Sequence, residues 1–381
     1  MTGFLALPED IKSLGKLVGT QADHAAACQR YILNNTGLQG GEGWLNDLSG
    51  AHEALVGNTA DWFSTLSRYT LEAAEFSITD SADYYAKTDA DSAAKLDSQL
   101  EGYQTSPPEG HEYHYERIEI VVGTFGEKYD PESYLTEPDD YAAQGAWRWE
   151  PSWSDYASIS SAGRGAIMAA TEGLSWLGLL DRSYDPYEFL LKPVTGDWAG
   201  FRACADVYRN TANACRSIEF NINHGRIGLP SAWSGRAADS CEHFLAAVCA
   251  ALPGAADVLD DIAEEYEDAA KGALEFSSVV GSLISSLVDA AVICAAALGG
   301  GAASASTIIG PIIGGGVALY EGKKIADMIN SLVDVYNTTK DIMAAVEAGM
   351  NSFGQLQASD KSLPKAPEAG DADSSMGQLP G

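Results

Sequence analysis

The six cysteines and six histidines are the residues of this sequence best suited to redox or metal chemistry. The cysteines stand at positions 28, 204, 215, 241, 249 and 294, and no two of them form a CxxC pair. Because zinc sites and thioredoxin-like centres use closely spaced thiols, the sequence favours neither. One close histidine pair, His111 and His114, lies among tyrosines and glutamates. We therefore expect no metal site and no cofactor.

Motifs for catalysis are also missing from the sequence. It contains no GxSxG, no HExxH and no P-loop, so no nucleophile, base or phosphate-binding loop is indicated. We predict that the protein is not an enzyme.

The charge balance excludes one class of partner. With 54 acidic and 23 basic side chains, the net charge of −31 should repel nucleic acid and anionic lipid headgroups. Two interpretations of the acidity stay open: a well-solvated surface, or attraction to a basic partner and tuning for export. The first residues, Met1 to Ile11, have no basic cluster and no long apolar core, so we expect no cleavable secretory signal peptide.

Residues 1–103 are predicted to form a helical hairpin. From Pro8 to Asn34 apolar side chains recur at steps of three and four, interrupted only by Gln21, as on one face of a helix: Ile11, Leu14, Val18, Ala25, Cys28 and Ile32. A glycine-rich loop follows, and then a second stripe: Leu48, Ala51, Leu55, Trp62, Leu66, Tyr69, Ala73 and Phe76. Two such helices pack antiparallel, and neither can bury its stripe alone. We predict that the second helix continues through Tyr85 and Asp89, which would then share one helix face.

Residues 104–158 are predicted to be an irregular, acidic and aromatic connector. Prolines near its start break the helix, and Glu116 to Gly123 is the one stretch that resembles a strand. The aromatic residues of 128–156 are expected to lie against the helices as a clamp, with a carbohydrate or peptide platform as the alternative. Residues 159–195 are expected to be a helical linker.

Residues 196–280 are predicted to form a second helical hairpin. Its first stripe consists of Phe201, Cys204, Tyr208, Cys215 and Ile218. The second stripe is the longest in the chain: Cys241, Leu245, Val248, Leu252, Ala255, Leu259, Ile262, Tyr266, Ala269, Ala273 and Phe276. Pro253 should bend this helix rather than end it. In the turn, Trp233 would fill the open end of the hairpin, and Gly235 would let the chain pass it closely.

In an antiparallel hairpin, the residue numbers of two residues that face each other have a nearly constant sum. Two pairs of cysteines in the second hairpin have similar sums and are therefore candidate disulfides. Cys215 with Cys241 and Cys204 with Cys249 have similar sums, although a mismatch of about one helical turn favours one bridge over two. Buried free thiols are the alternative.

The stretch from Ala290 to Tyr320 carries no charge and contains two triple-glycine runs. Two interpretations stay open: a buried helical hairpin within residues 281–354, or a membrane-inserting, pore-like element. A further amphipathic helix is predicted from Lys323 to Met350, followed by a disordered tail at 355–381.

Two of these patterns resemble one group of proteins. Tyr85-Ala-Lys-Thr-Asp89 at the end of the first hairpin resembles the YxxxD/E export signal of actinobacterial type VII (ESX) secretion substrates, and residues 1–103 look like the EspC-type family. Trp233-Ser234-Gly235 in the turn of the second hairpin resembles the motif of the WxG superfamily, exported by the same systems. No second export signal follows, since Ala270 stands four residues after Tyr266.

The resemblance implies an all-α fold of two long antiparallel hairpins in an elongated bundle. It also implies a non-enzymatic protein, secreted or at the cell surface, that acts by protein interaction or assembly. The implied partners are the secretion machinery or a chaperone, and a WxG-type helical partner or a second copy of the chain. The alternative function is a membrane-active or pore-like delivery module that uses residues 290–320, for which membrane contact would be needed.

Overall fold

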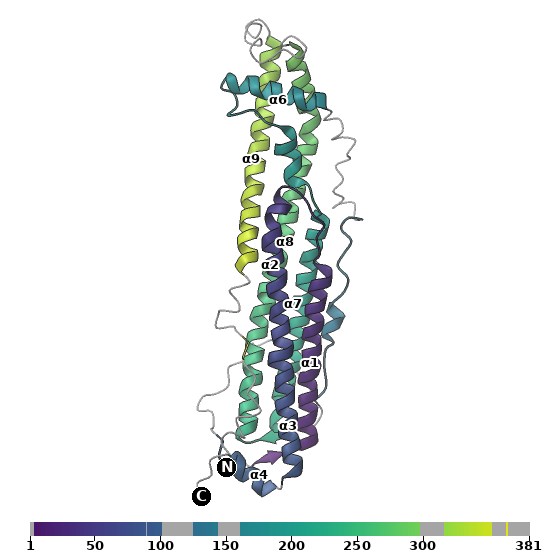
Figure 1. Cartoon of the computed structure of the whole chain (residues 1–381), viewed down its shortest axis with the longest axis vertical. Helices are drawn as coiled ribbons and strands as arrows, with labels where there is room; N and C mark the ends of the chain where they lie inside the picture. Colours follow the sequence, from purple (N-terminus) through teal and green to yellow (C-terminus); the bar gives the residue numbers. More distant parts are fainter. Residues whose placement is uncertain are drawn as a thin grey trace.

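The computed structural model describes residues 4–88, 90–100, 125–143, 161–297, 316–352 and 363–364. Over these residues the protein is an elongated bundle whose long helices run side by side along one axis (Figure 1). The predicted all-α class is confirmed. Several predicted features lie outside the described residues: Asp89, the pair His111 and His114, the expected strand at 116–123, residues 298–315 and nearly all of the tail.

The first hairpin begins with α1 (Pro8–Asn35). All six apolar residues predicted for its stripe are at most 1% exposed. The chain returns through α2 (Trp44–Thr65), a π-helical segment η1 (Leu66–Glu72) and α3 (Ala73–Lys87), which together lie along α1. Pro8 fits at the start of α1, because the first N–H groups of a helix have no intrahelical partner.

The predicted stripe of the second helix is correct up to Leu66 and wrong beyond it. Tyr69 and Phe76, which were expected to be buried, are 71% and 63% exposed. The cause is η1, because a π turn adds one residue and rotates everything after it around the helix axis. The buried residues Leu66 and Leu71 are accordingly five positions apart, and the stripe then continues through Ile78.

The second hairpin consists of α7 (Trp198–Gly228), the short η5 (Leu229–Ser231), β2 (Trp233–Ser234) and α8 (Arg236–Ala297). Asp197 caps α7 by accepting a hydrogen bond from the Gly200 N–H at 2.9 Å. Every residue of both predicted stripes is buried, and Pro253 lies inside α8 without ending it.

Helix α7 is the central helix of the bundle, because it packs against α8 on one side and against α1 on the other. Of its 31 residues, 20 are buried. Helices α1 and α7 run antiparallel: the Asn221 amide donates to the Gln21 amide oxygen at 3.1 Å, and the Asn210 amide donates to the Tyr31 hydroxyl at 3.0 Å. The first hairpin therefore buries its apolar stripe on the second.

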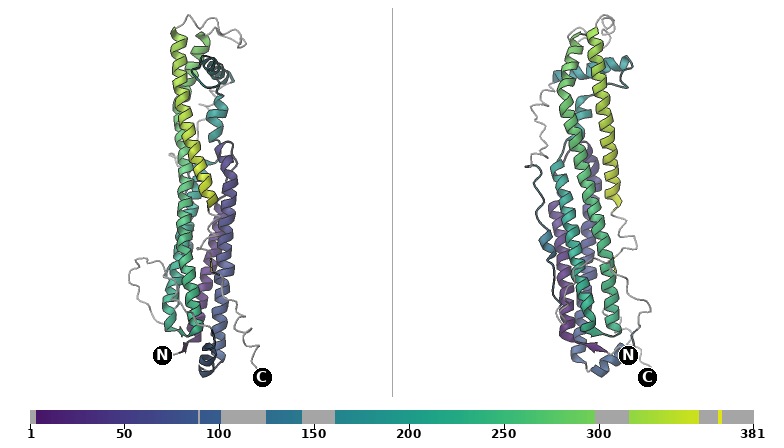
Figure 2. Two further views of the ribbon diagram at one scale, coloured as in Figure 1. Left: turned by 90° about the vertical axis from the view of Figure 1, so that its left-hand side faces the viewer. Right: turned by 180° about the vertical axis from the view of Figure 1, so that it is seen from behind.

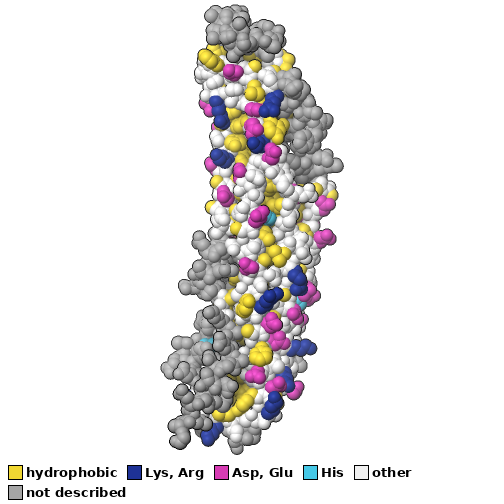
Figure 3. Space-filling model, in the orientation of Figure 1, with side chains coloured by type: hydrophobic (Ala, Val, Ile, Leu, Met, Phe, Trp, Pro, Cys, Tyr) yellow, Lys and Arg dark blue, Asp and Glu magenta, His cyan; other side chains and the backbone are white. Residues whose placement is uncertain are grey.

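Two further helices complete the end of the bundle distant from the N-terminus. Helix α9 (Gly316–Ser352) packs on the C-terminal half of α8, where the methyl groups of Thr339 and Ile342 lie beside Gly272. Helix α6 (Ser161–Trp176) lies across α8 and α9 near their ends (Figures 1 and 2). The small helix α4 (Ala90–Asp97) sits at the opposite end. On the face shown in Figure 3, acidic side chains are spread along the whole length of the bundle.

Residues 125–143, which we call the strap, run along the outside of α1 and α7 and contain the short helix η2 (Pro131–Tyr134) (Figure 2). This part of the aromatic connector therefore lies against the helices, as expected. Only some of its rings are covered: Tyr141 is buried, whereas Tyr129 and Tyr134 are 49% and 40% exposed.

The cysteine pairs predicted across the second hairpin are not brought together. The Cys215 thiol contacts the Leu252 carbonyl at 3.6 Å, and the Cys249 thiol contacts the Glu219 carbonyl at 3.9 Å. Leu252 is eleven residues from Cys241, or about 16 Å along the helix, and a disulfide requires Cα atoms within about 7 Å. The residue-number sums of the two predicted pairs correspond to a turn several residues before Trp233, where the chain in fact turns. All six cysteines are buried free thiols.

The π-helical shift predicts how two substitutions will differ. Leu71→Ala removes a fully buried side chain and should lower the free energy of unfolding by about 3 kcal/mol. Phe76→Ser, on the exposed face, should change it by less than about 0.5 kcal/mol. Guanidinium unfolding followed by circular dichroism measures both, and a larger loss for Phe76→Ser than for Leu71→Ala would contradict the shifted register.

Candidate functional site

The two sequence motifs meet at the end of the bundle where the chain begins. The strand β1 (Leu5–Ala6) pairs antiparallel with β2, so that Ala6 lies opposite Trp233 and Leu5 opposite Ser234. The Leu7 N–H adds a hydrogen bond to the Ala232 carbonyl at 2.9 Å. The N-terminal segment is therefore bound directly to the turn of the second hairpin.

Tyr85, from the last turn of α3, packs into the same place. Its ring lies edge-to-face on Trp233, with centroids 5.9 Å apart, and edge-to-face on Phe4 at 5.7 Å. Burial raises the pKa of Tyr85 to about 12, so the hydroxyl stays protonated at neutral pH. Trp233 itself is only 3% exposed. The motif tyrosine and the motif tryptophan thus form one aromatic contact between the two hairpins.

The prediction that one helix carries both Tyr85 and Asp89 is wrong. Helix α3 ends at Lys87, and Thr88 has an extended backbone with φ −113° and ψ 139°. Threonine is a poor helix former, because its branched side chain loses conformational freedom in a helix. The helix that carries Tyr85 therefore ends before Asp89.

An acid that the sequence patterns did not single out, Asp97, completes the contact. Its carboxylate accepts hydrogen bonds from the Arg236 N–H at 2.9 Å and the Ala237 N–H at 3.0 Å, and so caps the N-terminus of α8. The Arg236 guanidinium in turn donates to the Leu100 carbonyl, which follows α4. Asp97 is 8% exposed. Helix α4 of the first hairpin is thereby fastened to the start of α8.

Gly235 is required by this geometry. Its φ of +134° is a conformation that L-residues rarely adopt, and a Cβ there would lie 2.7 Å from the Asp97 carboxylate. Because glycine has no side chain to cap α8, the acceptor has to come from elsewhere in the chain. In the sequence, a glycine directly before a long helix indicates that the helix is capped by a residue from elsewhere in the chain. It does not indicate which acid is the cap.

A second place of interest is a cavity of about 550 Å³ beside the loop between α1 and α2. His52 lines it, but both ring nitrogens are already used: Nδ1 accepts from the Tyr266 hydroxyl at 2.6 Å, and Nε2 donates to the Thr36 carbonyl at 3.0 Å. Burial lowers the pKa of His52, which keeps the ring neutral. In the described part of the chain, no three His, Cys, Asp or Glu side chains are grouped to hold a metal ion. His52 therefore has no free ring nitrogen to direct into the cavity.

Comparisons with family models, curated proteins and solved structures found no match to this chain.

The cap on α8 predicts a loss of stability when its acid is removed. Asp97→Ala leaves the first N–H groups of α8 without their acceptor and should lower the free energy of unfolding by about 1–2 kcal/mol. Asp80→Ala, which removes an exposed acid from α3, is the matched control and should change it by less than about 0.5 kcal/mol. Equal effects of the two substitutions in urea unfolding would show that Asp97 does not act as the cap.

Proposed function

We propose that this chain is an exported, non-enzymatic helical protein, a substrate of a type VII (ESX) secretion system, and that it acts outside the cell by protein interaction or assembly. The observation that carries the proposal is the contact between Tyr85 and Trp233. Two motifs that resemble parts of such substrates lie far apart in the sequence, and they pack on each other in one place.

An export address that is read on a folded protein has to be a fixed surface. The contact of Tyr85 with Trp233, the strand pair and the Asp97 cap hold three separate chain segments together at this end. Tyr84, beside Tyr85, remains 38% exposed and is available to a receptor. We propose that the secretion machinery or its chaperone binds this end, with Tyr85 and Asp89 as the signal.

The packing of the first hairpin on α7 bears on whether the chain needs the expected WxG-type partner. The stripe of the first hairpin is buried on α7 of the same chain, so the first hairpin does not need a second protein to cover it. We infer that the second hairpin, with Trp233 in its turn, takes the partner's place within the chain. Assembly with further copies would then use other surfaces.

The alternative, a membrane-active module, is favoured by a different observation. Within α8 the segment Arg236–Cys294 contains a window of mean hydropathy 1.8, long and apolar enough to cross a membrane, of which 33% is buried. Near its end Val292 and Ile293 are 50% and 45% exposed. The core helix of a soluble protein has the same properties, and the whole predicted stripe of α8 is buried. Export followed by protein interaction is therefore the better-supported function.

Replacing the signal residues should abolish export without unfolding the protein. In a host with an active ESX system, Tyr85→Ala and Asp89→Ala should each leave the chain in the cell pellet, whereas Tyr69→Ala, a matched change of an exposed tyrosine, should be released normally. Circular dichroism of the purified variants checks that they are folded. Release of folded Tyr85→Ala and Asp89→Ala at the normal level would contradict the proposal.

Dye release from phosphatidylcholine vesicles separates the two functions. The leading proposal predicts no release above background at micromolar protein. If the chain did release dye, and if Val292→Asp with Ile293→Asp abolished the release, the membrane-active function would be favoured instead.

A further inference from the structure

Helix α6 ends in three exposed apolar side chains, which we call the knob: Trp176, Leu177 and Leu179 are 77%, 50% and 44% exposed. The end of α6 that leads into residues 177–182 projects sideways from the bundle (Figures 1 and 2). Single exposed apolar residues are common on proteins, whereas a tryptophan with two leucines in one short segment is typical of a surface that binds another protein. The knob is therefore a candidate contact surface.

A helix cap holds the knob in place. The Leu179 N–H donates to the Leu174 carbonyl at 2.9 Å, and the Gly178 N–H donates to the Ser175 carbonyl at 3.0 Å. With Gly178 at φ +71°, this is a Schellman cap, in which a glycine takes the left-handed conformation that ends the helix. Backbone hydrogen bonds therefore fix the chain that carries Trp176 and Leu179.

The segments on both sides of the knob are anchored in the bundle. Before the knob, Leu174 is buried and lies against Gly322 of α9. After the knob, Leu180 and Tyr184 are buried, and the Tyr184 N–H donates to the Thr171 hydroxyl at 3.1 Å. A surface that is already ordered loses little conformational entropy when it binds. The knob is thus preorganised for a partner.

One acid and one base lie next to the knob. The side chains of Asp181 and Arg182 are 70% and 65% exposed, and the Arg182 Nε is 3.9 Å from the Asp181 carboxylate. The Tyr184 hydroxyl donates to Asp181 at 2.5 Å and lowers the pKa of that carboxyl, so Asp181 is ionised at neutral pH. Such a pair is self-complementary: about a two-fold axis, Asp181 of each copy can face Arg182 of the other.

The distribution of charge makes the knob the most favourable place for a second copy. The net charge is −31, so two copies repel each other along most of their length. Residues 161–195, which include the knob, carry four acids and three basic residues and are close to neutral. Repulsion between copies is therefore weaker where the knob lies.

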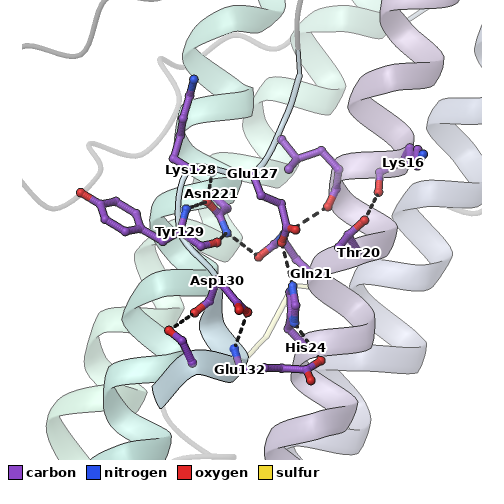
Figure 4. A network of polar contacts seen from close by, with 12 residues as sticks. Lys16, Thr20, Gln21, His24, Glu127, Lys128, Tyr129, Asp130, Glu132 and Asn221 are labelled. Atoms are coloured by element: carbon purple, nitrogen blue, oxygen red, sulfur yellow. Dashed lines mark hydrogen bonds and ion pairs between the residues drawn. The ribbon is translucent and has the colours of Figure 1, made fainter. Parts of the chain in front are cut away.

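The groove between α1 and α7, by contrast, is covered by the strap of the same chain (Figure 4). His24 on α1 lies 2.7 Å from a Glu127 oxygen and 3.1 Å from a Glu132 oxygen of the strap. The Asn221 side chain on α7 accepts a hydrogen bond from the Lys128 N–H at 2.9 Å. This face of the bundle is therefore occupied within the chain, unlike the knob.

We propose that two copies of this chain associate through their knobs, in a two-fold contact centred on Trp176 and flanked by pairs of Asp181 with Arg182. The apolar side chains then leave water at the centre of the contact, and the charges pair at its rim. A lipid surface fits the knob less well, because the ionised Asp181 would have to leave water beside it.

The knob contact rests on the proposed function in one respect, because it is the surface by which copies of the exported chain assemble. Self-association of the purified chain, however, is measured without a secretion system. Loss of export with intact self-association contradicts only the proposed function, and loss of self-association with normal export contradicts only the knob contact.

Sedimentation equilibrium of the purified full chain tests the contact. Three apolar side chains per copy are fewer than a standard interface uses, so the dimer should be weak, with a dissociation constant on the order of 10–100 µM. Trp176→Ser should raise this constant about tenfold. Phe76→Ser, which removes an exposed aromatic ring elsewhere on the bundle, is the matched control and should leave it unchanged. Circular dichroism checks that the variants are folded.

Charge reversal tests the two-fold pairing. Asp181→Lys and Arg182→Glu each place like charges opposite each other and should each weaken self-association about tenfold at low salt. An equimolar mixture of the two variants should associate as well as the original chain, because every acid then faces a base. Asp80→Lys, at an exposed acid of α3, changes the net charge as Asp181→Lys does and should have no such effect.

Three results would overturn the proposal. The first is the mass of a single chain at about 300 µM, well above the expected dissociation constant. The second is equal self-association of Trp176→Ser and the original chain. The third is a mixture of Asp181→Lys and Arg182→Glu that associates no better than either variant alone. A monomer that binds phosphatidylcholine vesicles through Trp176 would assign the knob to lipid and give the first result.

Discussion

The burial of α7 between two antiparallel neighbours is the interaction on which the rest of the structure depends. Helix α7 packs on α8 along one side and on α1 along the other. Because both neighbours run opposite to α7, both begin at the same end of the bundle (Figure 1). The segment before α1 is β1, and the segment before α8 is β2 with Trp233. Two antiparallel packings are therefore enough to bring the N-terminus to the turn that contains Trp233.

The contacts at that end follow from this arrangement. Once α2 and α3 return along α1, Tyr85 arrives beside Trp233, and α4 then lies close enough for Asp97 to cap α8. A glycine at the start of α8 suits the turn but leaves the helix without a cap of its own. The distant acid compensates for this, and it also links the two hairpins. The cap that the Gly235 turn requires and the packing of the two hairpins thus both stabilise the end of the bundle where α1 and α8 begin.

Much of this bundle could be predicted from the spacing of apolar residues, and the remainder could not for identifiable reasons. The stripes of α1, α7 and α8 follow the regular helical period, and the all-α class follows from them. The period failed where it was interrupted: η1 moved Tyr69 and Phe76 to the surface, and Thr88 ended α3 before Asp89. Contacts between segments that are distant in the sequence, such as Asp97 with α8 or His24 with the strap, do not produce a periodic pattern of apolar residues, so the sequence pattern could not predict them. The cysteine pairs were wrong because their residue-number sums correspond to a turn before Trp233 and not to the turn at Trp233 itself.

Tyr85 and Trp233 meet in one place because the two hairpins pack on each other through α7. A double-mutant cycle between Tyr85 and Trp233 tests it most directly, with the free energy of unfolding measured for the original chain, Tyr85→Ala, Trp233→Ala and the double variant. Aromatic rings in edge-to-face contact should give a coupling energy of about 0.5–1.5 kcal/mol. Additive effects, with no coupling beyond experimental error, would contradict the packing and the proposed export address with it.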